Sequence, residues 1–406
     1  MSLSLALKDS LKDLQVSPTL KAAMSQRQTP LVWKAGFGES AFFAPNCFNE
    51  ALKSQSHLKH YAETGGEVCL RTAISLFYQQ EFDLKVAAEN ILVFPGSKQA
   101  FFSLGAVLQK TCYLLPQGSW VSYQPQAMIN DHLYLWLPTR KEKNYALEAQ
   151  ILEDTLRNHL PKHLKNPPVL FLNNPTNPTG YVYSKQEIID LAAVARKYQI
   201  IILYDSIYAT KQTFSGQKFY FPQTFYPEGT FISAGISKVF SSGGKRLGYL
   251  LVPSQFDVIK QGLLTYISET VSSVCSTTQH ALTTMFQQEN RQELKDYIED
   301  TQQINAFIAS FLFDRFSKMG LEVCCADGAF YLMPCFDTKK TLLHKKGIFT
   351  SEQLANYLLA HLRVSVLAGS WFGVPKERLS VRVATQDFDG QKALQDIRNT
   401  GNSHHA

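Results

Sequence analysis

Short runs of consecutive apolar residues recur between about residues 65 and 285, and they constrain the fold more than any other feature of the chain. They lie at 91–94, 113–115, 169–172, 200–204, 230–233 and 249–252, with helical stretches and loops between them. Continuous apolarity, rather than alternation, is typical of strands that are buried on both faces. The pattern therefore predicts an α/β fold built on a mostly parallel sheet flanked by helices.

The length and the later pattern of the chain predict more than one domain. Its 406 residues exceed the size at which a single hydrophobic core stops growing. A long helical pattern at 291–316 and later strand-like runs indicate a smaller α+β domain after the sheet. We expect an N-terminal arm with part of the small domain in 1–47, a large domain in 48–288 and a small C-terminal domain in 289–406.

Charge and cysteine content exclude several classes of partner. The 40 basic and 34 acidic residues are spread along the chain without a basic block, so we expect no nucleic-acid partner. The seven cysteines form no Cys-x-x-Cys pair, which favours free thiols in a reducing compartment and no metal site. The first residues lack the apolar core of a signal peptide or membrane span, so we expect a cytoplasmic location and no membrane contact.

A strand, a glycine turn and a helical run follow one another around residue 96. Gly96, Ser97 and Lys98 come just after the run at 91–94 and open the next helical pattern. The free N–H groups and the dipole of a helix start attract anions, so these residues are a candidate anion site. The alternative is that Ser97 only caps the helix.

Polar and aromatic residues follow three other predicted strands, at the edge where ligands bind in such sheets. Two X-Pro steps within 173–180 predict a rigid, extended loop that orients the side chain of Asn177. Asp205 ends a buried strand, where a carboxylate needs a cationic or proton-donating partner unless it is only a helix cap. Tyr208 follows three positions later. Trp120 offers a large flat ring at the same edge, and the alternative is that it is an ordinary core residue.

The stretch 233–248 is too rich in serine and glycine for ordinary core. Lys238 lies between small residues, where its amine can reach a ligand, and Arg246 follows eight positions later beyond two glycines. Solvated loop charges are the alternative. Near the N-terminus, Gly36 and Gly38 predict either a close backbone approach or an ordinary turn.

In this order and spacing, these residues resemble the fold-type I, class I/II pyridoxal-phosphate-dependent aminotransferases over nearly the whole chain. The most specific segments are 174–180, the Asp205-x-x-Tyr208 pair, and Ser237-Lys238 with Arg246. The resemblance implies a seven-stranded sheet in the large domain, which would bind pyridoxal 5′-phosphate (PLP).

The resemblance also implies roles around the cofactor ring. Lys238 would form the Schiff base with the PLP aldehyde and shuttle the α-proton of the substrate. Asp205 would pair with the pyridinium nitrogen, Asn177 and Tyr208 would contact the phenolic oxygen, and Trp120 would stack on the ring.

Phosphate binding is implied for another group of residues. Ser97, Lys98 and Arg246 would hold the phosphate, with Ser237 beside the cofactor lysine. Tyr61 lies five residues before Gly66, and Leu70-Arg71 follows further along the chain. It matches the tyrosine that family members extend into the partner's phosphate site. The resemblance thus implies a homodimer.

The substrate carboxylate would be held by Arg382, with Arg378 as the fallback and the Gly38 backbone as a second contact. Arg382 lies within an apolar run, where an arginine needs an anionic partner. Four positions depart from the family pattern: Ser206 replaces a frequent glutamate, Gly118 a common proline, Gly235 a phosphate-binding serine of some members, and Lys245 a common aromatic residue.

The implied function is an aminotransferase that moves an amino group between an amino acid and a 2-oxo acid. One alternative is a PLP-dependent lyase, for example a β-eliminating C–S lyase, because the same scaffold supports other reactions at the α-carbon. A more distant alternative is a non-catalytic PLP-binding protein. The sequence does not identify the amino acid or the oxo acid.

Overall fold

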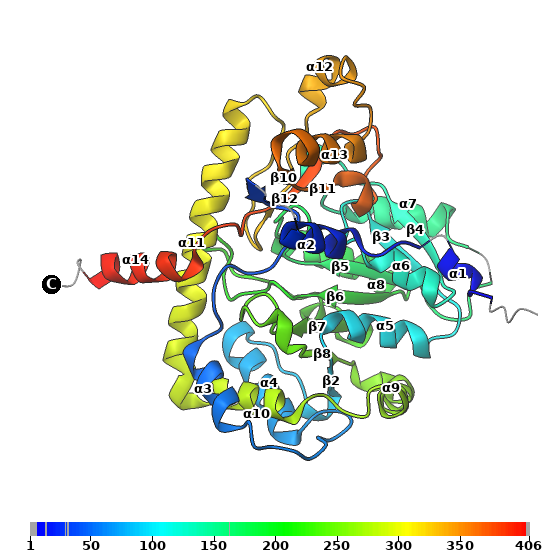
Figure 1. Ribbon diagram of the computed structural model, residues 1–406. Helices are drawn as coiled ribbons and strands as arrows, with labels where there is room; N and C mark the ends of the chain where they lie inside the picture. Colours follow the sequence, from blue (N-terminus) through cyan, green and yellow to red (C-terminus); the bar gives the residue numbers. More distant parts are fainter. Residues whose placement is uncertain (1–5, 13, 29, 31, 162, 403–406) are drawn as a thin grey trace, which may run out of the picture.

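A seven-stranded sheet forms the centre of the computed structural model, which describes residues 6–12, 14–28, 30, 32–161 and 163–402 (Figure 1). The strand order is β2-β8-β7-β6-β5-β3-β4. β8 is antiparallel to both of its neighbours, and the other pairs are parallel. The predicted α/β fold with a mostly parallel sheet is confirmed. The strands are β2 (Ile91–Phe94), β3 (Cys112–Pro116), β4 (Leu133–Leu137), β5 (Val169–Asn173), β6 (Ile201–Asp205), β7 (Thr230–Gly235) and β8 (Gly248–Leu251).

Six of these strands were predicted within two residues at each end, and β4 was not predicted. β4 lies at the edge of the sheet and pairs only with β3. Its first residue, Leu133, is exposed, and only Leu137 at its end is buried. An edge strand therefore lacks the uniform burial that identified the other strands.

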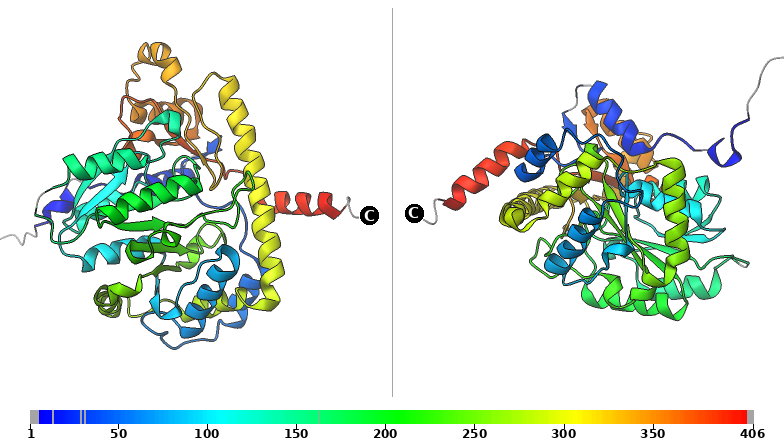
Figure 2. Two further views of the ribbon diagram at one scale, coloured as in Figure 1. Left: turned by 180° about the vertical axis from the view of Figure 1, so that it is seen from behind. Right: turned by 90° about the horizontal axis from the view of Figure 1, so that it is seen from below.

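Helices cover both faces of the sheet, as the views in Figure 2 show. Alternate strand residues point to opposite faces, and they enter two separate apolar clusters. The first cluster includes α4 (Val68–Phe82), α7 (Ala149–Asn158), α8 (Lys185–Lys197) and α10 (Ser276–Met285). The second includes α5 (Ser97–Val107), α6 (Tyr123–Ile129) and α9 (Asp257–Thr270). Both faces of the sheet are thus buried, which explains its continuous apolar strands.

Two small sheets lie beyond the large one. One has the order β11-β12-β9, with β11 (Leu367–Ala368), β12 (Val381–Ala384) and β9 (Tyr331–Leu332) antiparallel. The other pairs β1 (Trp33–Lys34) with β10 (Val364–Ser365) in parallel. A segment near the N-terminus is therefore paired with a segment of the C-terminal part of the chain.

The long helix α11 (Arg291–Lys318) runs along the side of the molecule, from the level of α3 (Asn46–Ser54) to that of α13 (Ser351–Leu362) (Figure 1). The remaining helices are α1 (Asp9–Lys12), α2 (Pro18–Gln28), α12 (Lys340–His344) and α14 (Gly390–Asn402). All seven cysteines are unpaired. Within the described ranges, no helix combines the length and apolarity needed to cross a membrane.

Candidate active site

The amine of Lys238 lies just beyond the end of β7, in the segment that was predicted to hold a ligand. Its Nζ donates a hydrogen bond to the backbone oxygen of Gly38, which lies 200 residues earlier in the chain. The pKa of Lys238 is lowered to about 8, first by burial and then by the nearby cation of Arg382. A larger fraction of this amine is therefore neutral, and nucleophilic, at physiological pH than for an exposed lysine.

Asp205 ends β6 and is 4% exposed. Its carboxylate accepts a hydrogen bond of 2.6 Å from the hydroxyl of Tyr123 on α6, and another from the backbone N–H of Ile207 at 3.2 Å. Burial raises its pKa to about 6, against the lowering effect of these donors and of Lys238. The sequence analysis missed Tyr123, although it lies only three residues after Trp120.

A pair of buried tyrosines connects the lysine side of the site to the small sheets. The hydroxyls of Tyr208 and Tyr331 are 2.8 Å apart and share a hydrogen bond. Tyr331 belongs to β9, and the guanidinium of Arg382 stacks over its ring at 4.6 Å from the centroid. The sequence analysis did not single out Tyr331, because an apolar strand gives no sign of which ring reaches the site.

Arg382 lies in β12 and is 1% exposed, which is exceptional for a cation. Its Nη2 donates to the backbone oxygen of Gly36 at 2.7 Å, and its Nη1 donates to Oδ1 of Asn177 at 3.2 Å. Among the residues that the structure describes, its Nε has no hydrogen-bond partner, and burial lowers the pKa of the guanidinium. A buried cation with a free donor and no carboxylate partner is suited to hold an anion from outside the chain.

The fallback candidate, Arg378, has a different environment. Its Nη1 forms an ion pair of 3.0 Å with Asp337, and its side chain is 36% exposed. The charge of Arg378 is therefore already balanced within the chain, whereas that of Arg382 is not.

The start of α5 and the loop before β8 form a narrow cradle. A Cβ on Gly96 would overlap the guanidinium of Arg246, whose Cζ would be 3.0 Å away. A Cβ on Gly248 would lie 2.5 Å from the backbone carbon of Gly96 and would also overlap the N–H of Ser97. Free backbone donors at a helix start, with an arginine above them, form a site that fits a phosphate group.

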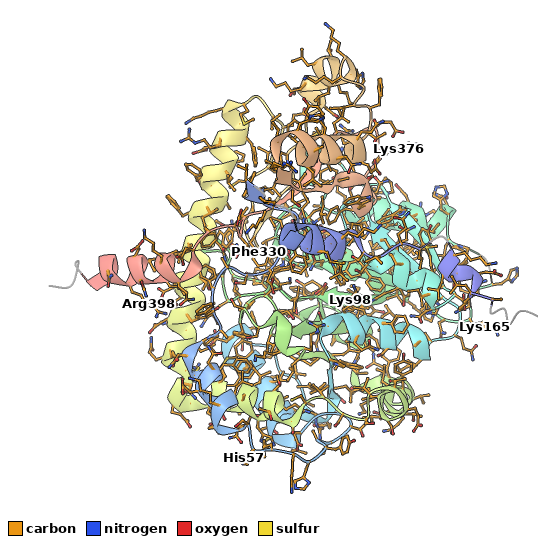
Figure 3. All side chains as sticks on the ribbon, in the orientation of Figure 1. His57, Lys98, Lys165, Phe330, Lys376 and Arg398 are labelled. Atoms are coloured by element: carbon orange, nitrogen blue, oxygen red, sulfur yellow. The ribbon has the colours of Figure 1, made fainter. Side chains whose placement is uncertain are left out.

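Lys98 and Trp120 lie beside this cradle. Nζ of Lys98 is 5.3 Å from the centre of the Trp120 ring, and Figure 3 shows Lys98 near the middle of the molecule. Burial, followed by the charge of Arg246, lowers the pKa of Lys98. Among the described residues, the cradle thus has two cations and an aromatic ring, which fits the phosphate and ring of PLP.

Gly235 departs from the family pattern for a steric reason. A Cβ at this position would lie 2.7 Å from the backbone oxygen of Leu247 and 2.9 Å from Cα of Gly248. The close pairing of β7 with β8 therefore excludes a serine here. Lys245 is exposed, and Ser237 is half-buried next to the lysine.

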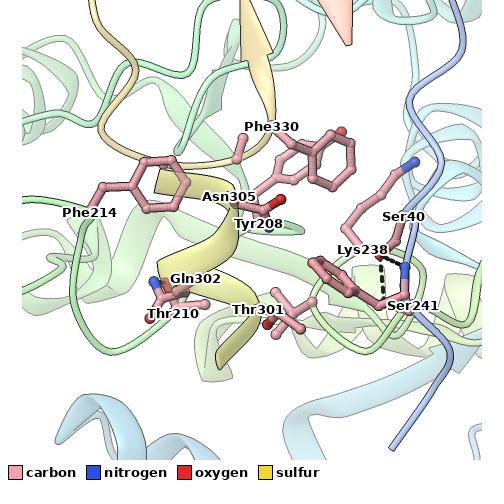
Figure 4. Close-up of a pocket in the computed structure, with 14 residues that line it drawn as sticks. Ser40, Tyr208, Thr210, Phe214, Lys238, Ser241, Thr301, Gln302, Asn305 and Phe330 are labelled. Carbon is pink, nitrogen blue, oxygen red and sulfur yellow. Dashed lines mark hydrogen bonds between the residues drawn. The ribbon is translucent and has the colours of Figure 1, made fainter. Parts of the chain in front are cut away.

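A small pocket adjoins Lys238 on the side of α11 (Figure 4). Its wall includes Tyr208 and Phe330, and Gln302 of α11 faces it together with Thr210. Apart from Lys238, the residues that line this pocket carry no charge. Tyr61, by contrast, is 89% exposed and is not a wall residue.

Comparison with known proteins places the site in context. The family model described as aminotransferase class I and II matches residues 30–396. The chain is 27% identical over 383 residues to an aspartate aminotransferase of Bacillus sp. strain YM-2, covering 91% of this chain and 92% of that protein. It is 26% identical over 400 residues to an asparagine–oxo-acid transaminase of Streptococcus mutans, covering 95% and 97%.

A solved structure, that of Thermus thermophilus aspartate aminotransferase with maleate, superposes with a TM-score of 0.82 at 25% identity. The superposition covers 97% of this chain and 99% of that one.

Proposed function

Because the chain belongs to the class I and II aminotransferases, which use PLP, we propose that Lys238, Asp205 and Arg382 perform its transamination reaction. The observation that carries this assignment is the buried Arg382, whose Nε has no partner, close enough to the amine of Lys238 to lower its pKa. Arg382 binds a carboxylate, and Lys238 exchanges a proton at the adjacent carbon. Membership of the family favours transamination over the lyase and non-catalytic alternatives.

Arg382 orients the substrate before any bond changes. Its guanidinium binds the α-carboxylate through the free Nε, and the stacked ring of Tyr331 at 4.6 Å limits its movement. The ion pair is desolvated because Arg382 is 1% exposed, so a correctly placed carboxylate gains more than it would in water. The α-carbon is thereby held near the amine of Lys238.

Lys238 moves the proton. Its Nζ, with a pKa lowered to about 8, accepts the α-proton in its neutral form and returns it as an ammonium. When bound, PLP supplies an aldehyde that takes up the amino group and a ring that accepts the electrons of the α-carbon. A pKa near the working pH suits both directions of the proton transfer.

Asp205 and Tyr123 belong to the part of the cofactor site that would face the ring nitrogen. With a pKa of about 6, Asp205 is mostly ionised at neutral pH and can hold a proton on a nitrogen that faces it. The 2.6 Å hydrogen bond from Tyr123 fixes the carboxylate in one orientation. Tyr123 therefore acts as a positioning residue.

The half-reaction tests the assignment. Purified protein loaded with PLP is expected to be yellow, and an accepted amino acid should bleach it while one equivalent of 2-oxo acid is released per site. Lys238→Arg removes the neutral amine and should abolish this bleaching, whereas Lys245→Arg is the matched control in the same loop. A Lys238→Arg protein with wild-type turnover would refute the assignment.

For the substrate, we propose a four-carbon acidic or amide amino acid. The support is that the relatives described above are named as aspartate and asparagine transaminases. In a panel assayed by bleaching, L-aspartate or L-asparagine should give the highest kcat/KM. A higher value for an aromatic or branched amino acid would overturn this proposal and leave the transamination chemistry intact.

We also propose that the active unit is a homodimer in which Tyr61 completes the phosphate site of the partner subunit. The 89% exposure of its ring is consistent with this, because a ring so exposed is available for contact with another subunit.

Subunit complementation tests the dimer. Tyr61→Ala and Lys238→Ala are each expected to inactivate the protein. After the two are mixed and allowed to exchange subunits, about half of the dimers are mixed, and each contains one intact site, which restores roughly a quarter of wild-type activity. If Tyr61 acts within its own subunit, no mixed dimer contains an intact site and no activity returns.

We propose a reducing, cytoplasmic location as well, which the seven unpaired cysteines support. Cell fractionation would test it, and recovery of the protein from an oxidising compartment would contradict it.

A further inference from the structure

Three hydroxyl groups form a continuous chain of hydrogen bonds next to Lys238, and Figure 4 shows two of them, Ser40 and Ser241. Oγ of Ser241 is 2.7 Å from Oγ of Ser40 and 2.6 Å from the hydroxyl of Tyr297 on α11. That hydroxyl is in turn 2.8 Å from the backbone oxygen of Phe43. This hydroxyl chain ties the loop that carries the lysine to α11 and to the N-terminal segment that contains Ser40.

The donor in each of these hydrogen bonds can be assigned, because every hydroxyl has a single proton. The backbone oxygen of Phe43 can only accept, so Tyr297 donates to it, and burial raises the pKa of Tyr297, which keeps its proton in place. Ser241 must then donate to Tyr297, and Ser40 to Ser241. The N–H of Phe42 donates to Oγ of Ser40 at 3.4 Å. Because the chain ends on a carbonyl oxygen, it cannot carry a proton away, and its function is to hold the segments together.

The turn after Lys238 needs this support. Ser241 has a φ of +48°, a left-handed conformation that costs an L-residue about 1–2 kcal/mol. Its N–H donates to the backbone oxygen of Lys238 at 3.2 Å, which closes the turn. The two side-chain hydrogen bonds of Ser241 offset the cost, since each contributes about 1 kcal/mol net. The conformation of the residues that follow the lysine thus depends on hydroxyls outside their own loop.

The N-terminal segment also supplies the acceptor for the lysine amine. Nζ of Lys238 donates a hydrogen bond to the backbone oxygen of Gly38, which lies two residues before Ser40. The hydrogen bond from Ser40 to Ser241 therefore joins the same two segments as the bond from the amine. Because both bonds join these segments, the one between the serines keeps the Gly38 oxygen close to the amine.

Four charged side chains from other parts of the site influence the same amine. Burial lowers the pKa of Lys238 most, Arg382 and Arg246 lower it further, and the carboxylates of Glu39 and Asp205 raise it. The effects of these charges partly cancel one another. The hydrogen bond to the neutral Gly38 oxygen is stronger from the ammonium than from the neutral amine, so it favours the protonated form.

We propose that the three residues of the hydroxyl chain are positioning residues and that they hold the Gly38 oxygen on the free amine of Lys238. The amine is free whenever it is not bonded to the cofactor, and only then can it exchange the α-proton of the substrate. Held in one place, it meets the α-carbon in a fixed orientation. This inference rests on the proposed role of Lys238, but the hold on the amine can be measured without cofactor.

Competitive labelling of the cofactor-free protein tests this hold. Trace acetic anhydride acylates lysines in proportion to their neutral fraction, and peptide mass spectrometry across a pH series follows Lys238, with Lys245 as the internal reference. In the wild-type protein, Lys238 should titrate with a pKa of about 8. Tyr297→Phe removes one oxygen atom and breaks the chain, so the Gly38 oxygen should move away and the pKa of Lys238 should fall to roughly 7–7.5. Ser40→Ala should act in the same direction.

Kinetics of the PLP-loaded enzyme separate positioning from substrate binding. Tyr297→Phe and Ser40→Ala should each lower kcat roughly 5- to 50-fold. KM should change little, because the substrate carboxylate is bound by Arg382. The combination of the two substitutions should cost little more than the more damaging single variant, since each breaks the same chain.

Tyr183→Phe is the matched control. Tyr183 and Tyr297 are both 3% exposed, and the hydroxyl of Tyr183 accepts a hydrogen bond of 2.9 Å from the N–H of Leu147. Removing this hydroxyl should lower the free energy of unfolding in urea about as much as Tyr297→Phe does. It should leave kcat and the labelling profile of Lys238 unchanged.

Three results would overturn the proposal. Unchanged labelling of Lys238 in both Tyr297→Phe and Ser40→Ala would show that the hydroxyl chain does not hold the amine. A shifted profile with wild-type kcat would show that the hold has no part in the reaction. An equal loss of kcat in Tyr183→Phe would show that destabilisation alone accounts for the effect.

Failure of the transaminase assignment would be distinguishable from these results. It would appear as wild-type turnover in Lys238→Arg, and it would leave the labelling profiles of the cofactor-free variants as expected.

Discussion

Replacing Gly38 with alanine tests how tightly the two halves of the active site are joined. A Cβ at this position would overlap the hydroxyl of Tyr331 and lie 2.7 Å from its Cε1 and Cζ atoms. Tyr331 is 1% exposed and shares a 2.8 Å hydrogen bond with Tyr208, so its ring cannot rotate freely into open space. Moving it would also shift Arg382, which stacks on the same ring.

The expected magnitude follows from overpacking of a buried contact. Forcing a methyl group into such a site costs about 1–3 kcal/mol. If the distorted arrangement persists in the transition state, kcat/KM for the amino acid falls roughly 5- to 160-fold. The positive φ that penalises alanine at many glycines does not apply, because Gly38 is not among the residues with positive φ. The effect is therefore steric.

Steady-state kinetics and urea unfolding of Gly38→Ala would measure both consequences. Combining it with Tyr331→Phe removes the overlapping oxygen but leaves the ring carbons at 2.7 Å, so activity should recover only in part relative to Tyr331→Phe alone. Gly262→Ala is the control, since its Cβ would lie 3.8 Å from that of Val107 within α9 and should stabilise the helix by up to about 1 kcal/mol. Wild-type kinetics for Gly38→Ala, or no recovery in the combination, would refute the reasoning.

Three further predictions concern charged groups. Burial raises the pKa of Asp205 from 3.8 to about 6, so the folded cofactor-free protein binds a proton on this carboxyl more readily than the unfolded chain does. Its free energy of unfolding should therefore fall as pH rises from about 4 to 6. Asp205→Asn should raise the unfolding free energy at pH 8 by up to about 3 kcal/mol while abolishing turnover. An unchanged pH profile of urea unfolding would contradict this. Arg382→Ala should lower kcat/KM roughly 100- to 1,000-fold, mainly because a buried ion pair to the substrate is lost. Arg378→Ala should have a much smaller effect. Equal losses for the two variants in steady-state assays would exclude a special role for Arg382. The rate at which PLP bonds to cofactor-free protein, followed by absorbance, should rise with pH and level off above about 8, where Lys238 becomes neutral; a rate that keeps rising to pH 10 would show an unshifted amine.

The sheet was predictable because burial on both faces imposes a pattern on contiguous residues. Six strands carry that pattern, and the resemblance to a known family supplied the number seven. β4 did not carry it, because Leu133 at its start is exposed at the edge of the sheet. The pairing of β1 with β10, more than 300 residues apart, was beyond sequence reasoning, because two-residue strands leave no periodic signal.

The roles of the predicted site residues stay predictions, and the residues that contact them were harder to find. Tyr123 supports Asp205 through its hydroxyl, and Tyr331 links Tyr208 to Arg382. Both tyrosines lie in segments that resemble ordinary core. Their function depends on which neighbour each hydroxyl meets, and that neighbour is 82 residues away for Tyr123 and 123 residues away for Tyr331.

The sequence alone determined the fold class and the family, and it predicted which groups carry the chemistry, because strand burial and strand-end polar residues are local properties of the chain. The preference for Arg382 over Arg378 gained its physical support only from the tertiary structure. Both are arginines near the end of the chain, but only folding gives one of them a carboxylate partner in Asp337 and leaves the other buried with a free Nε.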